Sequence, residues 1–114
     1  MGFVIDHLDH LVLTVANIDA SVAFYTSHLG MELITFGNRK ALRFGEQKIN
    51  LHQAGKEFEP KAVRPTPGSA DLCFITKAPL EQVISHLKAR GCAIELGPVP
   101  RDGARGEMLS LIHI

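Results

Sequence analysis

The first half of the chain alternates between the two hydrophobic periods that distinguish strands from helices. The stretch LDHLVLTV (8–15) is rich in Leu and Val and predicts a strand. Polar residues around Asn17 then interrupt the apolar run, and Asp19 is expected to cap a helix. An apolar stripe predicts that helix, formed by Ile18, Val22, Tyr25 and Leu29. Gly30 is a natural residue to end it.

Short apolar segments separated by glycine turns follow this helix. They predict three further strands, at 31–36, 40–45 and 47–53. The predicted order of the first half is therefore β-α-β-β-β, which is an α+β arrangement.

The second half repeats the strand–helix–strand order after a linker. Residues 55–69 are rich in proline, glycine and charge, which is typical of a linker. The elements predicted after it are a strand at 70–76, a helix starting near Pro79, a strand at 92–96, a loop at 97–106 and a strand at 107–114. An offset of 61 residues aligns His10 with Asp71 and Gly30 with Gly91. This match indicates an internal duplication.

The length and the duplication together predict one domain made of two modules. The 114 residues suit a single domain. We expect that domain to span 1–114, with a first module at about 5–54, the linker at 55–69 and a second module at 70–114.

The charge balance and the cysteines narrow the classes of partner and compartment. Twelve basic residues balance twelve acidic ones, which argues against a nucleic-acid surface and gives no reason to expect a membrane. The apolar runs are far shorter than the roughly 18 residues of a membrane span. Cys73 and Cys92 form no CxxC motif, so we expect reduced core thiols and a cytoplasmic protein.

Three side chains could carry chemistry, because strand alternation groups them by face. His10 lies in an otherwise apolar strand, His52 shares a face of its strand with Asn50, and Asp71 stands where the duplication repeats His10. Two imidazoles and a carboxylate are a usual ligand set for a catalytic divalent metal with open positions. The plainer alternatives are hydrogen-bonded histidines and, for Asp71, a turn cap.

Charged residues beside turns are a further candidate. Arg39 and Lys40 next to a predicted turn, and Arg101 and Arg105 in the later loop, could bind an anionic substrate. Such side chains are more often simply solvated.

Four longer motifs stand out along the chain: LDHLVLTV, SVAFYTSHLGM, KINLHQAGKEFEPKA and PTPGSADLCFIT. Together they resemble the vicinal oxygen chelate superfamily of glyoxalases, bleomycin resistance proteins and extradiol dioxygenases. The chain is most similar to the subgroup called glyoxalase-domain-containing protein five. The resemblance implies tandem βαβββ modules that form an open, barrel-like mixed sheet around one divalent metal ion, which could be Zn, Mn, Ni or Fe.

The resemblance also assigns roles to individual residues. His10 matches the family's first-strand histidine ligand, and Asp71 stands where many members carry a histidine. Asn50 stands where lyase members place a glutamate, with His52 on the same face. Family chains continue past a strand like EMLS into a turn and a last strand with a glutamate ligand, whereas this chain stops at LSLIHI with no such turn and no such glutamate. We therefore expect a second module that is incomplete and truncated near Met108, followed by a foreign tail.

The resemblance implies an activity on a small molecule. A metal-dependent lyase or dioxygenase would act on a small substrate with adjacent oxygens. One alternative is a metal-free, drug-sequestering binding protein, which would be a homodimer. Another is an inactive fragment of a truncated reading frame.

Overall fold

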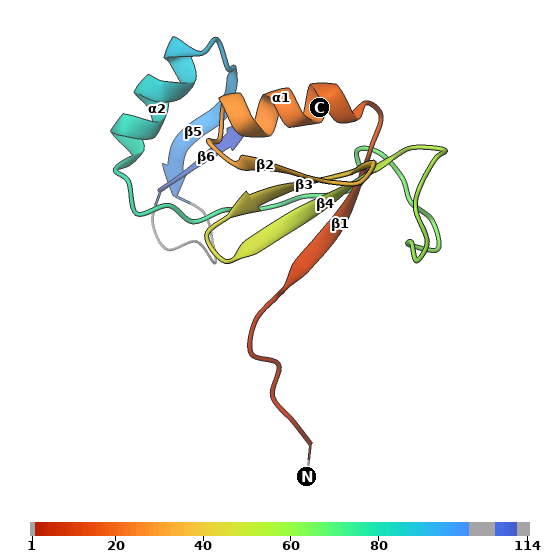
Figure 1. Ribbon diagram of the computed structural model, residues 1–114. Coiled ribbons are helices and arrows are strands. Elements are labelled where there is room, and N and C mark those ends of the chain that lie inside the picture. Colours follow the sequence, from red (N-terminus) through yellow and green to blue (C-terminus); the bar gives the residue numbers. More distant parts are fainter. Residues whose placement is uncertain (1, 101–106, 112–114) are drawn as a thin grey trace. The chain divides into compact units, whose positions relative to one another are not determined.

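The computed structural model of the chain describes residues 2–100 and 107–111 (Figure 1). The chain divides into two compact units, Met1–Ala70 and Asp71–Ile114. Each unit is described by itself below. In the described part of the chain, no helix is long and apolar enough to cross a membrane.

The first unit is a βαβββ module, which confirms the predicted order. Its elements are β1 (His10–Val15), α1 (Ile18–Ser27), β2 (Glu32–Phe36), β3 (Arg39–Phe44) and β4 (Gln47–Gln53). The strands form an open four-stranded sheet in the order β1-β4-β3-β2. β1 runs parallel to β4, whereas the two other pairs are antiparallel, so the sheet is mixed.

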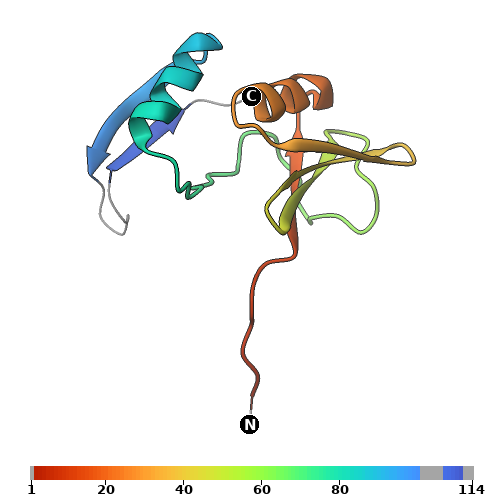
Figure 2. The same ribbon diagram turned by 60° about the vertical axis from the view of Figure 1, so that its left-hand side comes forward.

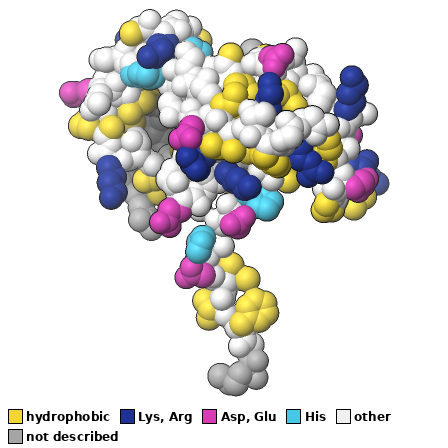
Figure 3. Space-filling model, viewed as in Figure 1, with side chains coloured by type: hydrophobic (Ala, Val, Ile, Leu, Met, Phe, Trp, Pro, Cys, Tyr) yellow, Lys and Arg dark blue, Asp and Glu magenta, His cyan; other side chains and the backbone are white. Residues whose placement is uncertain are grey.

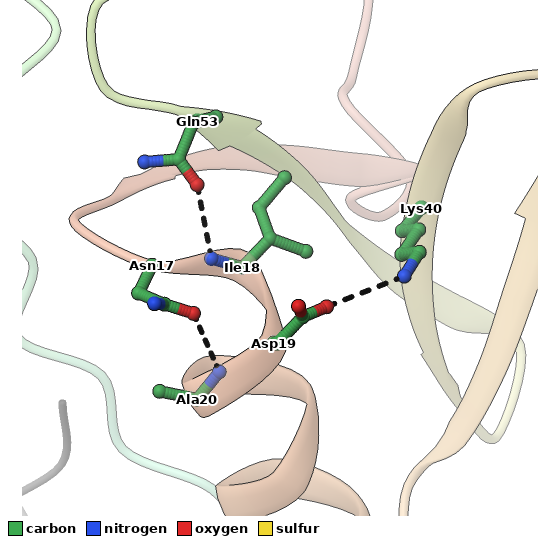
Figure 4. Close-up of polar contacts among 6 residues, drawn as sticks. All are labelled: Asn17, Ile18, Asp19, Ala20, Lys40 and Gln53. Carbon is green, nitrogen blue, oxygen red and sulfur yellow. Dashed lines mark hydrogen bonds and ion pairs between the residues drawn. The ribbon is translucent and has the colours of Figure 1, made fainter.

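Asn17, rather than the predicted Asp19, caps the start of α1. The Asn17 Oδ1 accepts a hydrogen bond of 2.9 Å from the backbone N–H of Ala20, three residues later (Figure 4). This satisfies one of the helix N–H groups that have no partner within the helix. Asp19 lies in the first turn, where its negative charge interacts favourably with the helix dipole.

Two side-chain contacts join the start of α1 to the sheet. The backbone N–H of Ile18 donates to Oε1 of Gln53 at 3.1 Å, and Lys40 lies 3.5 Å from the Asp19 carboxylate (Figure 4). Gln53 ends β4 and Lys40 belongs to β3. The helix is therefore held over one face of the sheet by contacts from two different strands.

The core of the first unit lies between α1 and this face. The sheet contributes the buried side chains of Leu13, Val15, Leu42, Ile49 and Leu51. The helix contributes Phe24 and Tyr25, whose rings meet edge to face with centroids 5.2 Å apart. Burying each large apolar side chain stabilises the fold by about 1.5–3 kcal/mol.

The segment before β1 is extended and carries exposed apolar side chains. Phe3, Val4 and Ile5 are all exposed. Figure 3 shows these hydrophobic groups gathered on the N-terminal segment. Residues 2–9 thus lead into β1 without contributing to the core.

The second unit contains one helix and a two-stranded sheet among its described residues (Figure 2). Its elements are α2 (Leu80–Ala89), β5 (Ile94–Pro100) and β6 (Glu107–Leu111), the two strands being antiparallel. Gly91 follows the helix with a φ of +71°, a conformation that favours glycine and ends a helix. The strand predicted at 92–96 therefore starts later and extends into the predicted loop. The rest of that loop, 101–106, lies outside the described residues.

The strand predicted at 70–76 is wrong. This segment has no strand in the structure. In the first unit, β1 is a strand because β4 supplies its hydrogen-bonded partner. Among the described residues of the second unit, β5 and β6 pair only with each other, and 70–76 has no such partner. An apolar run without a ladder partner leaves its backbone groups unpaired and does not form a sheet. The end of the predicted foreign tail, 112–114, lies outside the described residues.

Candidate functional site

The four-stranded sheet has a second face, which we call the open face: the side chains of β1–β4 that point away from α1. Leu42 of β3 and Leu51 of β4 are buried on the helix side, so alternation along the strands assigns their neighbours to the other side. The polar or charged members of the open face are His10, Thr14, Glu32, Arg39, Arg43, Lys48, Asn50 and His52. Two of the three predicted site residues are therefore on one face.

His10 begins β1 and is oriented by its neighbour. The His10 Nδ1–H donates to the Asp9 carboxylate at 2.7 Å, and 39% of the His10 side chain is exposed. This hydrogen bond is the main cause that lowers the pKa of Asp9. Asp9 precedes the strand, so strand alternation does not turn its side chain away from His10. With Nδ1 as the donor, Nε2 keeps its lone pair for another partner.

His52 is enclosed although its ring is polar. Only 6% of the residue is exposed, and its Nδ1 has no hydrogen-bond partner among the described residues. The His52 ring lies edge-on to Phe58, with centroids 5.9 Å apart. The guanidinium of Arg39 lies 4.4 Å above the centre of the same Phe58 ring. Phe58 thus contacts both the buried imidazole of His52 and the guanidinium of Arg39.

Asn50 repeats this pattern two residues earlier on β4. Its Oδ1 is buried and has no hydrogen-bond partner in the described part of the chain. Each unsatisfied buried polar group costs about 1–3 kcal/mol. Two of them on one face are therefore candidates for contact with a ligand.

The strand register separates the two histidines along the open face. His10 lies opposite Lys48, whereas His52 lies opposite Thr14, four residues further along β1. Four residues of strand span about 13 Å. Two nitrogen ligands of one zinc ion lie roughly 4 Å apart at most, given Zn–N bonds of about 2.0–2.1 Å. The register therefore does not bring these imidazoles together.

Asp71 belongs to the second unit, where it is exposed. Over residues 2–100 and 107–111, no three or more His, Cys, Asp and Glu side chains form a group that could hold a metal ion. The assignment of His10, His52 and Asp71 as metal ligands stays a prediction.

Sequence reasoning missed Phe58 and the role of Asp9. Phe58 lies in the proline-rich linker, and nothing in its local pattern indicates contact with His52 and Arg39. The Asp-His pair occurs twice, at 6–7 and 9–10, and this repeat could have indicated that Asp9 bonds to His10.

The core position predicted for Cys73 is wrong, because this side chain is exposed, whereas Cys92 is buried. Cys73 is exposed since it lies in the segment that forms no strand.

The sequence matches one protein family over almost its whole length. Residues 7–109 match the family described as the Glyoxalase/Bleomycin resistance protein/Dioxygenase superfamily. The chain belongs to this superfamily. The predicted resemblance is therefore confirmed at the level of the superfamily.

Two curated relatives are similar to this member of the glyoxalase superfamily. Virulence protein STM3117 of Salmonella typhimurium is 58% identical over 109 residues, which are 95% of this chain and 76% of the relative. Glyoxalase domain-containing protein RDO1 of Mycosarcoma maydis is 53% identical over 105 residues, 91% of this chain. The chain spans 59% of the length of RDO1.

Solved structures agree with this assignment. The crystal structure of STM3117 matches with a TM-score of 0.86 and 57% identity, covering 96% of this chain and 87% of that one. An integron cassette protein of V. cholerae matches with a TM-score of 0.87 and 53% identity, covering 97% and 88%. The chain therefore shares its fold with these two proteins.

Proposed function

We propose that this glyoxalase-superfamily protein is a divalent-metal-dependent lyase or dioxygenase that acts on a small substrate with adjacent oxygens. The observation that carries the proposal is the Asp9–His10 pair at the start of β1. A carboxylate that accepts the second N–H of a histidine is the usual support for a metal-ligating imidazole. His10 also faces the open side of the sheet, where a substrate has access.

The residues of the first unit fit such a metal in part. His10 would supply one ligand, and we propose the exposed carboxylate of Asp71 as another. His52, the third predicted ligand, lies at the other end of the open face from His10. We propose that it contacts the substrate rather than the metal. The bound ion would polarise a substrate oxygen. This assignment requires the second unit to act as a second βαβββ module, incomplete in this chain, that joins the first in an open barrel-like sheet.

Metal titration of two matched variants tests the proposal. His7 and His10 each follow an aspartate and bond to it, but only His10 belongs to a strand. We expect His10→Ala to weaken the binding of zinc, manganese, nickel or iron(II) by more than about tenfold in calorimetric titration, and Asp9→Asn by about tenfold. His7→Ala should change the affinity less than about twofold. Equal losses in the His7 and His10 variants would contradict the proposal.

The second candidate is a metal-free small-molecule binding protein that acts as a homodimer. The unpaired Oδ1 of Asn50 favours it, because an amide is a weaker metal ligand than a carboxylate and a better hydrogen-bonding group for a neutral ligand. In this case a chelator would leave ligand binding unchanged. Loss of ligand binding with a chelator, restored by added metal, would favour the enzyme instead.

A further inference from the structure

We propose that the open face carries a subsite for a small oxyanion, a carboxylate or phosphate group, between Arg39 and His52. The subsite rests on the proposed function in one respect: it takes the open face as the substrate-binding face. It adds the chemical class of the substrate, which would be an anion.

Two arginines on the same face of β3 differ in how their charges are paired. The Arg43 guanidinium donates to the Glu32 carboxylate at 2.7 Å. Arg39 instead lies over the Phe58 ring, and among the described residues it forms no ion pair. A cation–π contact holds a guanidinium in place without neutralising its charge. Arg39 is thus an oriented cation without an anionic partner in the part of the chain that the structure describes.

The buried imidazole of His52 stands beside this cation. The His52 ring is edge-on to the Phe58 ring, and the guanidinium of Arg39 lies over the face of the same ring. Both side chains therefore contact Phe58. Since a buried ring nitrogen without a partner is costly, a ligand that accepts or donates there is stabilised on binding.

Glu57 directly precedes Phe58, and its carboxylate already accepts a hydrogen bond. It accepts a hydrogen bond of 2.9 Å from the backbone N–H of Gly55, and backbone hydrogen bonds lower its pKa. Glu57 also interacts electrostatically with His52. Because the Glu57 side chain bonds to its own loop, it leaves the guanidinium of Arg39 available to an external anion.

An oxyanion meets the requirements of both side chains. A guanidinium binds carboxylate and phosphate through two parallel N–H donors, and an imidazole N–H adds a third. The subsite lies about 13 Å along the strands from His10. A substrate that contacts both His10 and the subsite therefore places an anionic group about 13 Å from His10.

Anion titration of matched variants tests the subsite. Inorganic phosphate and acetate are added separately to the full chain, and the His52 imidazole signals are followed by NMR. We expect Arg39→Gln to weaken the binding of the preferred anion by about tenfold or more. Arg43→Gln should change it less than about twofold, because Arg43 is already paired. Whichever anion binds more tightly identifies the headgroup.

The outcomes separate this inference from the proposed function. Loss of anion binding in Arg39→Gln, with binding retained in His10→Ala, supports the subsite even if no metal binds. Equal weakening by Arg39→Gln and Arg43→Gln would mean general charge attraction and overturn the subsite. Failure of both phosphate and acetate to shift His52 would also overturn it, while leaving metal binding at His10 intact.

Discussion

The helix-covered face and the open face of the four-stranded sheet share the same strands but differ in how their polar groups are paired. On the covered face, Leu42, Ile49 and Leu51 pack under α1, and the polar groups at its margin are joined to the helix. On the open face, Asn50 and His52 hold buried polar atoms without partners among the described residues. The covered face carries the apolar core, whereas the open face keeps two buried polar atoms that a bound ligand would satisfy.

The largest expected effect is a loss of stability when the buried part of the covered face loses volume. Leu42 is fully buried, and Leu33 lies opposite it in the register with 38% exposed. We expect Leu42→Ala to lower the free energy of unfolding by about 3 kcal/mol and Leu33→Ala by less than about 1 kcal/mol. Tyr25 is the only tyrosine, and the chain has no tryptophan, so tyrosine fluorescence during urea unfolding reports on this core. Equal losses in the two variants would contradict the described core.

The covered face should also make stability depend on alkaline pH. Burial raises the pKa of Tyr25 to about 12, from 10.0. The neutral phenol therefore stabilises the fold fully below pH 10, and this contribution is lost as the pH rises through 12. It amounts to roughly 3 kcal/mol. Urea unfolding followed by circular dichroism should show this loss in the wild type and not in Tyr25→Phe. A parallel pH dependence in both proteins would rule out this role.

The smallest expected change in stability comes from a substitution on the open face. It should stabilise the fold slightly, whereas the core substitutions destabilise it. Asn50→Leu removes a buried amide oxygen that has no hydrogen-bond partner among the described residues, so we expect the free energy of unfolding to stay constant or to rise by about 1 kcal/mol. The same substitution should weaken ligand binding. A loss of more than about 2 kcal/mol would mean that the Asn50 amide has a structural partner, and the contrast between the faces would fail.

The sequence predicts the module well where the signal is local. Apolar segments bounded by turn residues identify β1 to β4, and helical periodicity identifies α1, because each pattern depends on neighbours within one element. The capping residue was wrong, since Asn17 and Asp19 are both good caps and only the backbone decides between them. The strand at 70–76 was wrong because a strand also needs a distant partner. No periodicity of the linker predicts that Phe58 would meet His52.

The central claim, that the open face binds the ligand, is tested most directly by one set of histidine NMR spectra. Zinc and phosphate are titrated separately into labelled protein, and the imidazole signals of His7, His10, His52 and His86 are compared. The account predicts that zinc shifts His10 first and that phosphate shifts His52 first. It also predicts that His86, exposed on α2, stays unchanged at those concentrations. Shifts of His7 and His86 as large as those of His10 and His52 would contradict it.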